Sequence, residues 1–289
     1  MNFSRRNFCQ TMLAGIAVGA AGGCQALGCG GKKPQAAVQL YSVRNLCSKD
    51  LAGVLKQLKA MGYDGVEFAG YYGKSAKELK QMLDDIGLKV AGTHINANEL
   101  RPQNIGSLLD FANEIGNPYI VCPGGGFKQG SEAELKEMAD LFAQAAVAAK
   151  PRGIRIGYHN HQHEFEKKFV NNTKCAWELF FDQTSPDVFT QLDIGHCQAK
   201  NQDPMFWLRK YPGRAVTVHI KENYAVSKTG ILGRYHEGAD PSKGVKWDEV
   251  FAFLAAHGCE QYVVECESDP STLSAVEGCI QYMRAKKYV

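Results

Sequence analysis

The sequence lacks several features that would place it in other protein classes. No apolar run reaches the roughly 20 residues that a bilayer-spanning helix needs, so we expect no permanent membrane span. The net charge is only +3, and lysine and arginine form no cluster beyond the N-terminus, which argues against a nucleic-acid partner. No G-x-G-x-x-G motif follows the first apolar run, which disfavours an open dinucleotide-binding sheet.

Cysteine is present, but in no metal-binding arrangement. The ten cysteines form no C-x-x-C pair and no zinc-ribbon spacing, so we predict no structural metal cluster. Three of them lie near the N-terminus, and Cys122 and Cys266 end apolar runs that are typical of buried strands. Such positions favour reduced, buried thiols over a disulfide framework.

The N-terminus has the sequence MNFSRRNFCQTMLAGIAVGAAGGC, in which Arg5 and Arg6 precede small, weakly apolar residues. It resembles a bacterial twin-arginine export signal. Cys24 and Cys29 each follow small residues, as the lipid-attachment cysteines of bacterial lipoproteins do, so a lipid anchor and simple cleavage are both open. We predict a leader over residues 1–34, an exported protein that is periplasmic or membrane-anchored, and one domain over residues 35–289.

From residue 36 onward, short apolar runs alternate with amphipathic helical patterns. The first helix, for example, has Leu51, Val54 and Leu58 at helical spacing and ends at Gly62. Strands that are apolar throughout and separated by helices indicate a parallel sheet covered by helices. Eight such units in about 250 residues predict a (β/α)8 TIM barrel. The predicted strands are residues 36–41, 65–69, 88–94, 119–124, 154–161, 188–196, 215–222 and 261–266.

Polar residues gather at the carboxyl ends of these strands, where TIM barrels carry their active sites. One such residue means little, because a lone histidine there is more often a structural residue with satisfied hydrogen bonds. Polar residues at most of the strand ends together favour one common site. These residues are Glu67, His94, His159, His161, Asp193, His196, His219, Lys221, Glu265 and Glu267. The segment 223–246 is long for a barrel loop, and we expect it to cover the substrate.

Three of these positions, Asp193, His219 and Glu265, offer mixed oxygen and nitrogen ligands to a divalent metal, with a fourth ligand from the fifth strand. Mn, Zn, Co and Mg all suit such a set, and histidine favours Mn or Zn. A metal held in this way can polarise a carbonyl and make the adjacent carbon acidic. A nearby carboxylate or imidazole can then move the proton.

The motifs GYDGVEF, YHNH, LDIGH, HIKE and VVECES at successive strand ends resemble the xylose-isomerase-like TIM-barrel superfamily over residues 36–286. The superfamily holds sugar isomerases and epimerases, inosose and dehydroshikimate dehydratases, and endonuclease IV relatives. The resemblance implies a metal bound by residues that include Asp193, His219 and Glu265. It also implies substrate contacts at His196 and Lys221, and we add Glu67 and His94 to this predicted substrate-binding set.

The fifth strand departs from the family pattern, because His159 stands where the epimerases have a metal-binding glutamate. In those enzymes two glutamates exchange the substrate proton from opposite faces, so the change argues against symmetric two-carboxylate epimerisation. We predict Glu265 and His159 as the catalytic pair, with His159 also a metal ligand. His161 and Glu164 remain alternative ligands.

Three functions follow from this pattern. The first is a metal-dependent sugar isomerase or epimerase that abstracts a proton next to a carbonyl. The second is a lyase or dehydratase that performs β-elimination on a keto-sugar or 3-keto-glycoside, which the histidine substitution favours. The third is an exported carbohydrate-binding barrel without catalysis. All three imply a small-molecule carbohydrate partner, and the sequence gives no indication of an oligomeric state.

Overall fold

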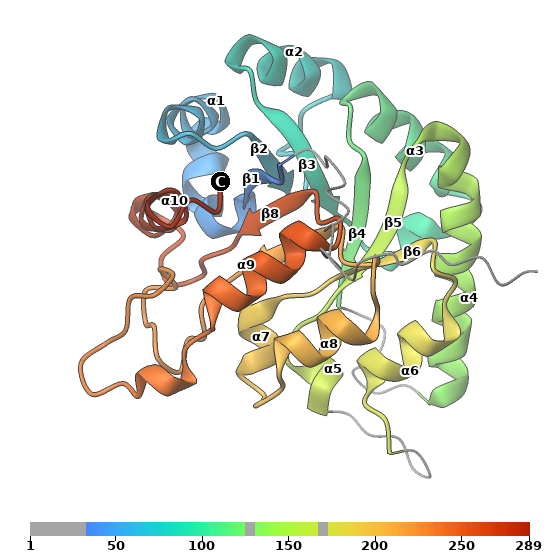
Figure 1. The fold of residues 1–289 in the computed structure, drawn as a ribbon. Coiled ribbons are helices and arrows are strands. Elements are labelled where there is room, and N and C mark those ends of the chain that lie inside the picture. The colour runs from blue at the N-terminus through green and yellow to red at the C-terminus, as the bar shows by residue number, and fades with distance from the viewer. Residues whose placement is uncertain (1–32, 125–130, 167–172) are drawn as a thin grey trace, which may run out of the picture. The chain divides into compact units, whose positions relative to one another are not determined.

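The computed structural model describes residues 33–124, 131–166 and 173–289, which all belong to one compact unit. Within it, parallel strands alternate with helices along the chain (Figure 1). The strands are β1 (Gln35–Gln39), β2 (Gly65–Phe68), β3 (Lys89–His94), β4 (Tyr119–Pro123), β5 (Arg155–His159), β6 (Val188–Gln191), β7 (Thr217–Ile220) and β8 (Gln261–Val264).

The helices follow the strands and pack around the sheet (Figure 1). They are α1 (Arg44–Met61), α2 (Ala76–Ile86), α3 (Ile105–Glu114), α4 (Glu132–Ala149), α5 (His163–Glu166), α6 (Ala176–Gln183), α7 (Ile194–Gln198), α8 (Pro204–Lys210), α9 (Trp247–Ala256) and α10 (Ser274–Ala285). Short 3-10 turns are η1 (Leu40–Val43), η2 (Ala97–Leu100), η3 (Lys150–Arg152) and η4 (Pro241–Lys243).

Local sequence signals determine where these helices begin and end. In α2, Ser75 caps the helix by accepting a hydrogen bond from the Glu78 N–H, and the Glu78 side chain bonds back to Ser75. Gly87 ends the helix with a φ of 75°, a conformation that costs glycine little. The chain then turns directly into β3, so the cap and the glycine together set where that strand starts.

The eight strands form one parallel sheet in the order β6-β5-β4-β3-β2-β1-β8-β7. The two ends of this order meet, because Asp193 and His219 form a parallel bridge and the His219 N–H donates to the Leu192 carbonyl at 3.0 Å. The sheet is therefore a closed (β/α)8 barrel, as predicted. Its closing seam runs through two residues of the predicted site.

The barrel interior changes from apolar to polar toward the carboxyl ends of the strands. Small residues fill one interior layer, where Ala37, Ala91 and Val263 pack together. The next inward positions of β1 and β2 are Gln39 and Glu67, both fully buried. Buried polar groups need hydrogen-bond partners, so this layer is a connected network and the base of the site.

The cysteines in the described part of the chain are free and buried, as predicted for Cys122 and Cys266. Of the predicted leader, only Lys33 and Pro34 fall within the described residues. None of the helices in the described ranges is both long and apolar enough to cross a bilayer.

Candidate functional site

A cavity of about 490 Å³ opens at the carboxyl ends of the strands, and we call it the mouth cavity. Its volume is in the usual range for small-molecule sites. Its wall includes predicted site residues together with others such as Tyr41, Ile95 and Pro123. The predicted residues in its wall are His94, His159, His161, Glu265 and Glu267. A second cavity of about 600 Å³, between α7, α8 and the segment before α9, contains none of the predicted site residues.

Four buried side chains meet at the base of this cavity: His159, Asp193, His219 and Glu265, which we call the quartet. One ligand atom from each lies within 4.8 Å of all the others. Asp193 caps α7 through Oδ1, which accepts from the His196 N–H at 2.7 Å, and its Oδ2 has no hydrogen-bond partner. His159 Nδ1 is also buried without a partner. Two unsatisfied buried atoms facing a mixed nitrogen and oxygen set fit a divalent metal.

The ring of His219 is held between two carboxylates. Its Nε2–H donates to Glu67 Oε2 at 2.7 Å, and its Nδ1–H donates to Glu265 Oε2 at 2.9 Å. Burial alone would lower the pKa of His219, but Glu67 and Glu265 outweigh it and raise the pKa to about 10. A carboxylate behind a metal-ligating histidine fixes the ring and strengthens it as a ligand.

Glu67 lies beneath the cavity rather than in its wall. Its carboxylate is fully buried and accepts hydrogen bonds from Gln39 at 2.8 Å and from Gln191 at 2.7 Å. Burial would raise its pKa, but His94 and His219 outweigh that effect and lower it. Gly92 provides the space, since a Cβ there would lie 2.7 Å from Glu67 Oε1. This placement favours orientation of His219 over the substrate contact that we expected for Glu67.

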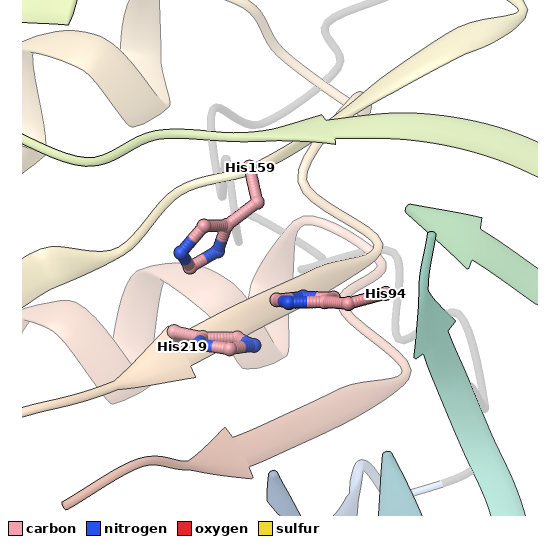
Figure 2. A group of neighbouring side chains, drawn as sticks. All are labelled: His94, His159 and His219. Atoms are coloured by element: carbon pink, nitrogen blue, oxygen red, sulfur yellow. The ribbon is translucent and has the colours of Figure 1, made fainter. Parts of the chain in front are cut away.

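Three histidine rings lie next to one another, with those of His94 and His219 nearly parallel (Figure 2). His94 and His219 stack with ring centroids 5.2 Å apart, and the His159 ring lies 4.4 Å from that of His219. Burial first, and then the neighbouring His219 and His94, lower the pKa of His159 well below its ordinary value. His159 is therefore a neutral imidazole with a lone pair available to a metal or a proton.

Lys221 places a fully buried ammonium group beside the quartet. Its Nζ lies 3.5 Å from Glu265 Oε2, 3.6 Å from Asp193 Oδ2 and 3.0 Å from His196 Nε2, and it also pairs with Glu267. Burial would lower the pKa of Lys221, but these carboxylates outweigh it and raise the pKa. In turn, burial would raise the pKa of Glu265, but Lys221 and His219 hold it well below the ordinary value. Both groups are charged, which gives one acid and one base side by side.

The other fifth-strand candidates lie apart from the quartet. His161 lines the mouth cavity, and Glu164 is fully buried next to Tyr158, whose hydroxyl donates to it at 2.8 Å. His161 and Glu164 group with His163, whereas His159 joins the quartet. Of the three residues considered for the fifth-strand ligand, the geometry brings His159 to the other three ligands.

Sequence reasoning missed Gln39, Gln191 and Glu222. The two glutamines occupy inward positions of β1 and β6, and a polar residue inside an apolar strand pattern was the available signal. Glu222 is fully buried and accepts from the backbone N–H groups of Asn223, Gly233 and Val245 and from Trp247 Nε1. It thereby ties down the segment 223–246. That segment lines the second cavity and contributes no wall to the mouth cavity, so the expected substrate cover is not formed in this conformation.

The comparisons with known proteins point to sugar-processing enzymes. Inosose dehydratase 2 of Bacillus cereus is 25% identical over 267 residues, which cover 81% of this chain and 87% of that protein. A crystal structure of a sugar phosphate isomerase/epimerase from Parabacteroides distasonis ATCC 8503 superposes with a TM-score of 0.72 at 26% identity, covering 89% of this chain and 98% of that one. The IOLI protein with a binding zinc atom has a TM-score of 0.62 at 16% identity, covering 88% and 96%, which shows the fold alone.

These comparisons contradict the predicted exported location. The relatives that match 81% of the chain are inosose dehydratases, and neither export nor a lipid anchor is part of their description. The prediction depended on an arginine pair followed by small residues, a short pattern with low specificity. The cysteines proposed for lipid attachment, Cys24 and Cys29, lie outside the described residues. The assignment to the periplasm or to a membrane anchor was wrong.

The family match covers most of the barrel. A family model described as the xylose isomerase-like TIM barrel matches residues 55–285, which include every strand except β1 and all four members of the quartet. The closed barrel of eight parallel strands confirms the fold that the sequence predicted. The chain belongs to the xylose isomerase-like TIM barrel family, a family of sugar-processing enzymes.

Proposed function

We propose that this protein is a metal-dependent lyase that removes a β-substituent from a keto-sugar or 3-keto-glycoside. The observation that carries the proposal is the pairing of one acid and one base, Lys221 and Glu265, on the same side of the site at 3.5 Å. The neutral imidazole of His159 replaces the carboxylate that a symmetric epimerase would need. The inosose dehydratase relatives, at 25% identity, also support an elimination.

We propose one divalent ion, Mn, Zn, Co or Mg, bound by the quartet. When bound, it polarises the substrate carbonyl and acidifies the adjacent C–H. The buried Asp193 Oδ2 and His159 Nδ1 support this assignment, because neither atom has a hydrogen-bond partner and each can donate an electron pair to a metal. The histidine content favours Mn or Zn.

The chain's own groups complete a syn elimination. The ionised Glu265 carboxylate accepts the proton from the carbon next to the carbonyl, and the electron pair of that C–H bond forms the new C=C bond. The C–O bond to the β-substituent breaks, and the leaving oxygen takes a proton from the Lys221 ammonium. His196, 3.0 Å from Lys221 Nζ, relays a replacement proton to it from solvent, and Glu265 releases the proton that it took up. Atoms and charge balance without any redox partner.

Isomerisation or epimerisation is the second candidate, and one observation favours it. His159 and Glu265 both line the mouth cavity, so an imidazole and a carboxylate are available to exchange the substrate proton. Such a reaction needs no leaving group and no acid at Lys221. The structural likeness to a sugar phosphate isomerase/epimerase at 26% identity supports it.

Incubation with Mn²⁺ in D₂O, first with a ketose and then with a 3-keto-glycoside, distinguishes the two reactions. The lyase proposal expects stoichiometric release of the aglycone and an enone absorbance from the glycoside. Deuterium incorporation without release of aglycone or water would refute the lyase and support the epimerase. If neither the wild type nor Asp193→Ala binds metal or turns over either substrate, the result supports a carbohydrate-binding barrel without catalysis.

A further inference from the structure

A second cluster of metal-ligating side chains lies in the turn from β5 into α5, and the proposed reaction does not use it. The cluster consists of His161, His163 and Glu164, and we call it the turn cluster. One ligand atom from each residue lies within 4.8 Å of the other two. The His159 and His161 rings are 5.2 Å apart and nearly perpendicular, at 80°, and His159 groups with the quartet whereas His161 groups with the turn cluster.

The space that these atoms face is kept open by a glycine. Gly124, directly after β4, has a φ of 51°, and a Cβ on it would lie 2.5 Å from His161 Nδ1 and 3.3 Å from Glu164 Oε1. Any side chain at position 124 would therefore fill the point on which the two donor atoms converge. The missing side chain leaves room there for an atom of another kind.

The carboxylate of the turn cluster is held in place by groups behind it. The Tyr158 hydroxyl donates to Glu164 Oε1 at 2.8 Å, and the His161 backbone N–H donates to Glu164 Oε2 at 2.8 Å. His163 Nε2 is buried and lies 2.9 Å from Glu164 Oε1, so the two ligand atoms adjoin each other. A carboxylate fixed from behind and adjoining imidazole nitrogens are what a preorganised metal site requires.

We propose that the turn cluster binds a second divalent cation, separate from the ion of the quartet. Two imidazoles and one carboxylate form the three-ligand set that zinc takes when one coordination position stays open. That open position faces the mouth cavity, because His161 and Gly124 both line it. A water molecule or a hydroxyl of the sugar can occupy it, so the second cation adds a contact for substrate at the rim of the site.

The test counts metal ions on the full-length protein without any sugar, so its result is independent of the proposed reaction. Protein stripped with a chelator is loaded with Zn²⁺, passed over a desalting column and assayed for metal and protein. Two equivalents are expected for the wild type, and one each for His163→Ala and Asp193→Ala. His257→Ala, which removes an exposed ring that stacks on Phe253, serves as the matched control and should keep two.

Gly124→Ala is a second, independent variant, because its methyl group occupies the point of convergence while all three ligands remain. It should also bind one equivalent, and circular dichroism shows whether each variant is folded. A wild type that binds one equivalent would overturn the proposal. So would retention of two equivalents by both His163→Ala and Gly124→Ala.

Discussion

The Glu67 carboxylate gives the sharpest test of how the site is organised. Its two oxygens face N–H donors from Gln39, Gln191 and His219, and the His94 Nε2 lies 3.0 Å away. Glu67→Gln keeps the size but offers only one accepting oxygen. The amide NH₂ must therefore face a donor, and the least costly choice points it at Gln191. His219 then keeps an oxygen partner but loses the negative charge behind its ring.

The expected loss follows from the role of such partners in metal sites. Removal of a group that orients a metal-ligating histidine lowers metal affinity by about 10–100-fold, or about 1.4–2.8 kcal/mol. Because Glu67→Gln keeps the hydrogen bond, we expect a loss of about tenfold. Glu67→Ala removes the bond as well, so we expect about 100-fold.

The measurement is a Zn²⁺ competition titration against a chromophoric chelator, in a His163→Ala background so that only the quartet is counted. Glu137→Gln, which neutralises an exposed carboxylate on α4, is the matched control and should leave the affinity unchanged. Circular dichroism confirms folding. If folded Glu67→Gln and Glu67→Ala both bind Zn²⁺ within twofold of the control, Glu67 does not orient His219, and the reasoning fails.

Three further predictions follow from the same contacts. Lys221→Met should lower kcat on an alkyl keto-glycoside by about 10²–10⁴-fold. The loss should be much smaller on a nitrophenyl keto-glycoside, because its leaving group needs no proton. Equal losses on the two substrates would exclude Lys221 as the acid. The pKa of His219 is about 10 in the metal-free protein, raised from 6.5, so its ion pairs contribute stability that is complete below about pH 6.5 and lost as the pH rises through 10. Metal must displace that proton, so calorimetry at pH 7 in two buffers of different ionisation enthalpy should show release of about one proton, and no release would contradict the shift. Glu222→Ala leaves buried N–H donors unpaired and should lower the free energy of unfolding by about 3 kcal/mol. Trypsin should then cleave faster at Lys228 and Arg234. An unchanged cleavage rate would show that Glu222 does not hold the segment 223–246.

The fold was predictable because its signals are local and repeated. Helix caps such as Ser75 and helix-ending glycines such as Gly87 recur between apolar runs, and eight runs of strand length leave few alternatives to a parallel barrel. The predicted strands overran the observed ends by a few residues, most clearly at β6, where the chain enters α7 at Ile194. Asp193 caps that helix, and its carboxylate belongs both to the cap and to the site.

A periodic pattern predicts which side of a strand a residue faces, but not how deep in the barrel the side chain lies. Alternation places Glu67 and Glu265 on the inward side of the barrel, but it does not say that Glu67 lies below the cavity and Glu265 in its wall. Nor does it show that Gly92 clears space for one carboxylate, or that Glu222 accepts from three backbone N–H groups of the segment 223–246 and from Trp247 of α9. These contacts depend on which strands become neighbours, so they can be read only from the folded barrel.

Two residues of the quartet, Asp193 and His219, also form the bridge that closes the barrel. Neighbouring strands elsewhere in the barrel pair over at least two residues each, whereas the seam between β6 and β7 is marked by the isolated Asp193–His219 bridge. The bridge holds one carboxylate and one imidazole of the quartet on opposite sides of the seam. A ligand that binds both residues links the two sides of the seam. Because such a ligand binds only the folded state, it also stabilises the fold, by an amount that grows with the logarithm of the ligand concentration. An Asp193 substitution therefore acts on barrel closure and on metal binding at once. Its effect on catalysis can be assigned to the metal only when the free energy of unfolding is measured beside it.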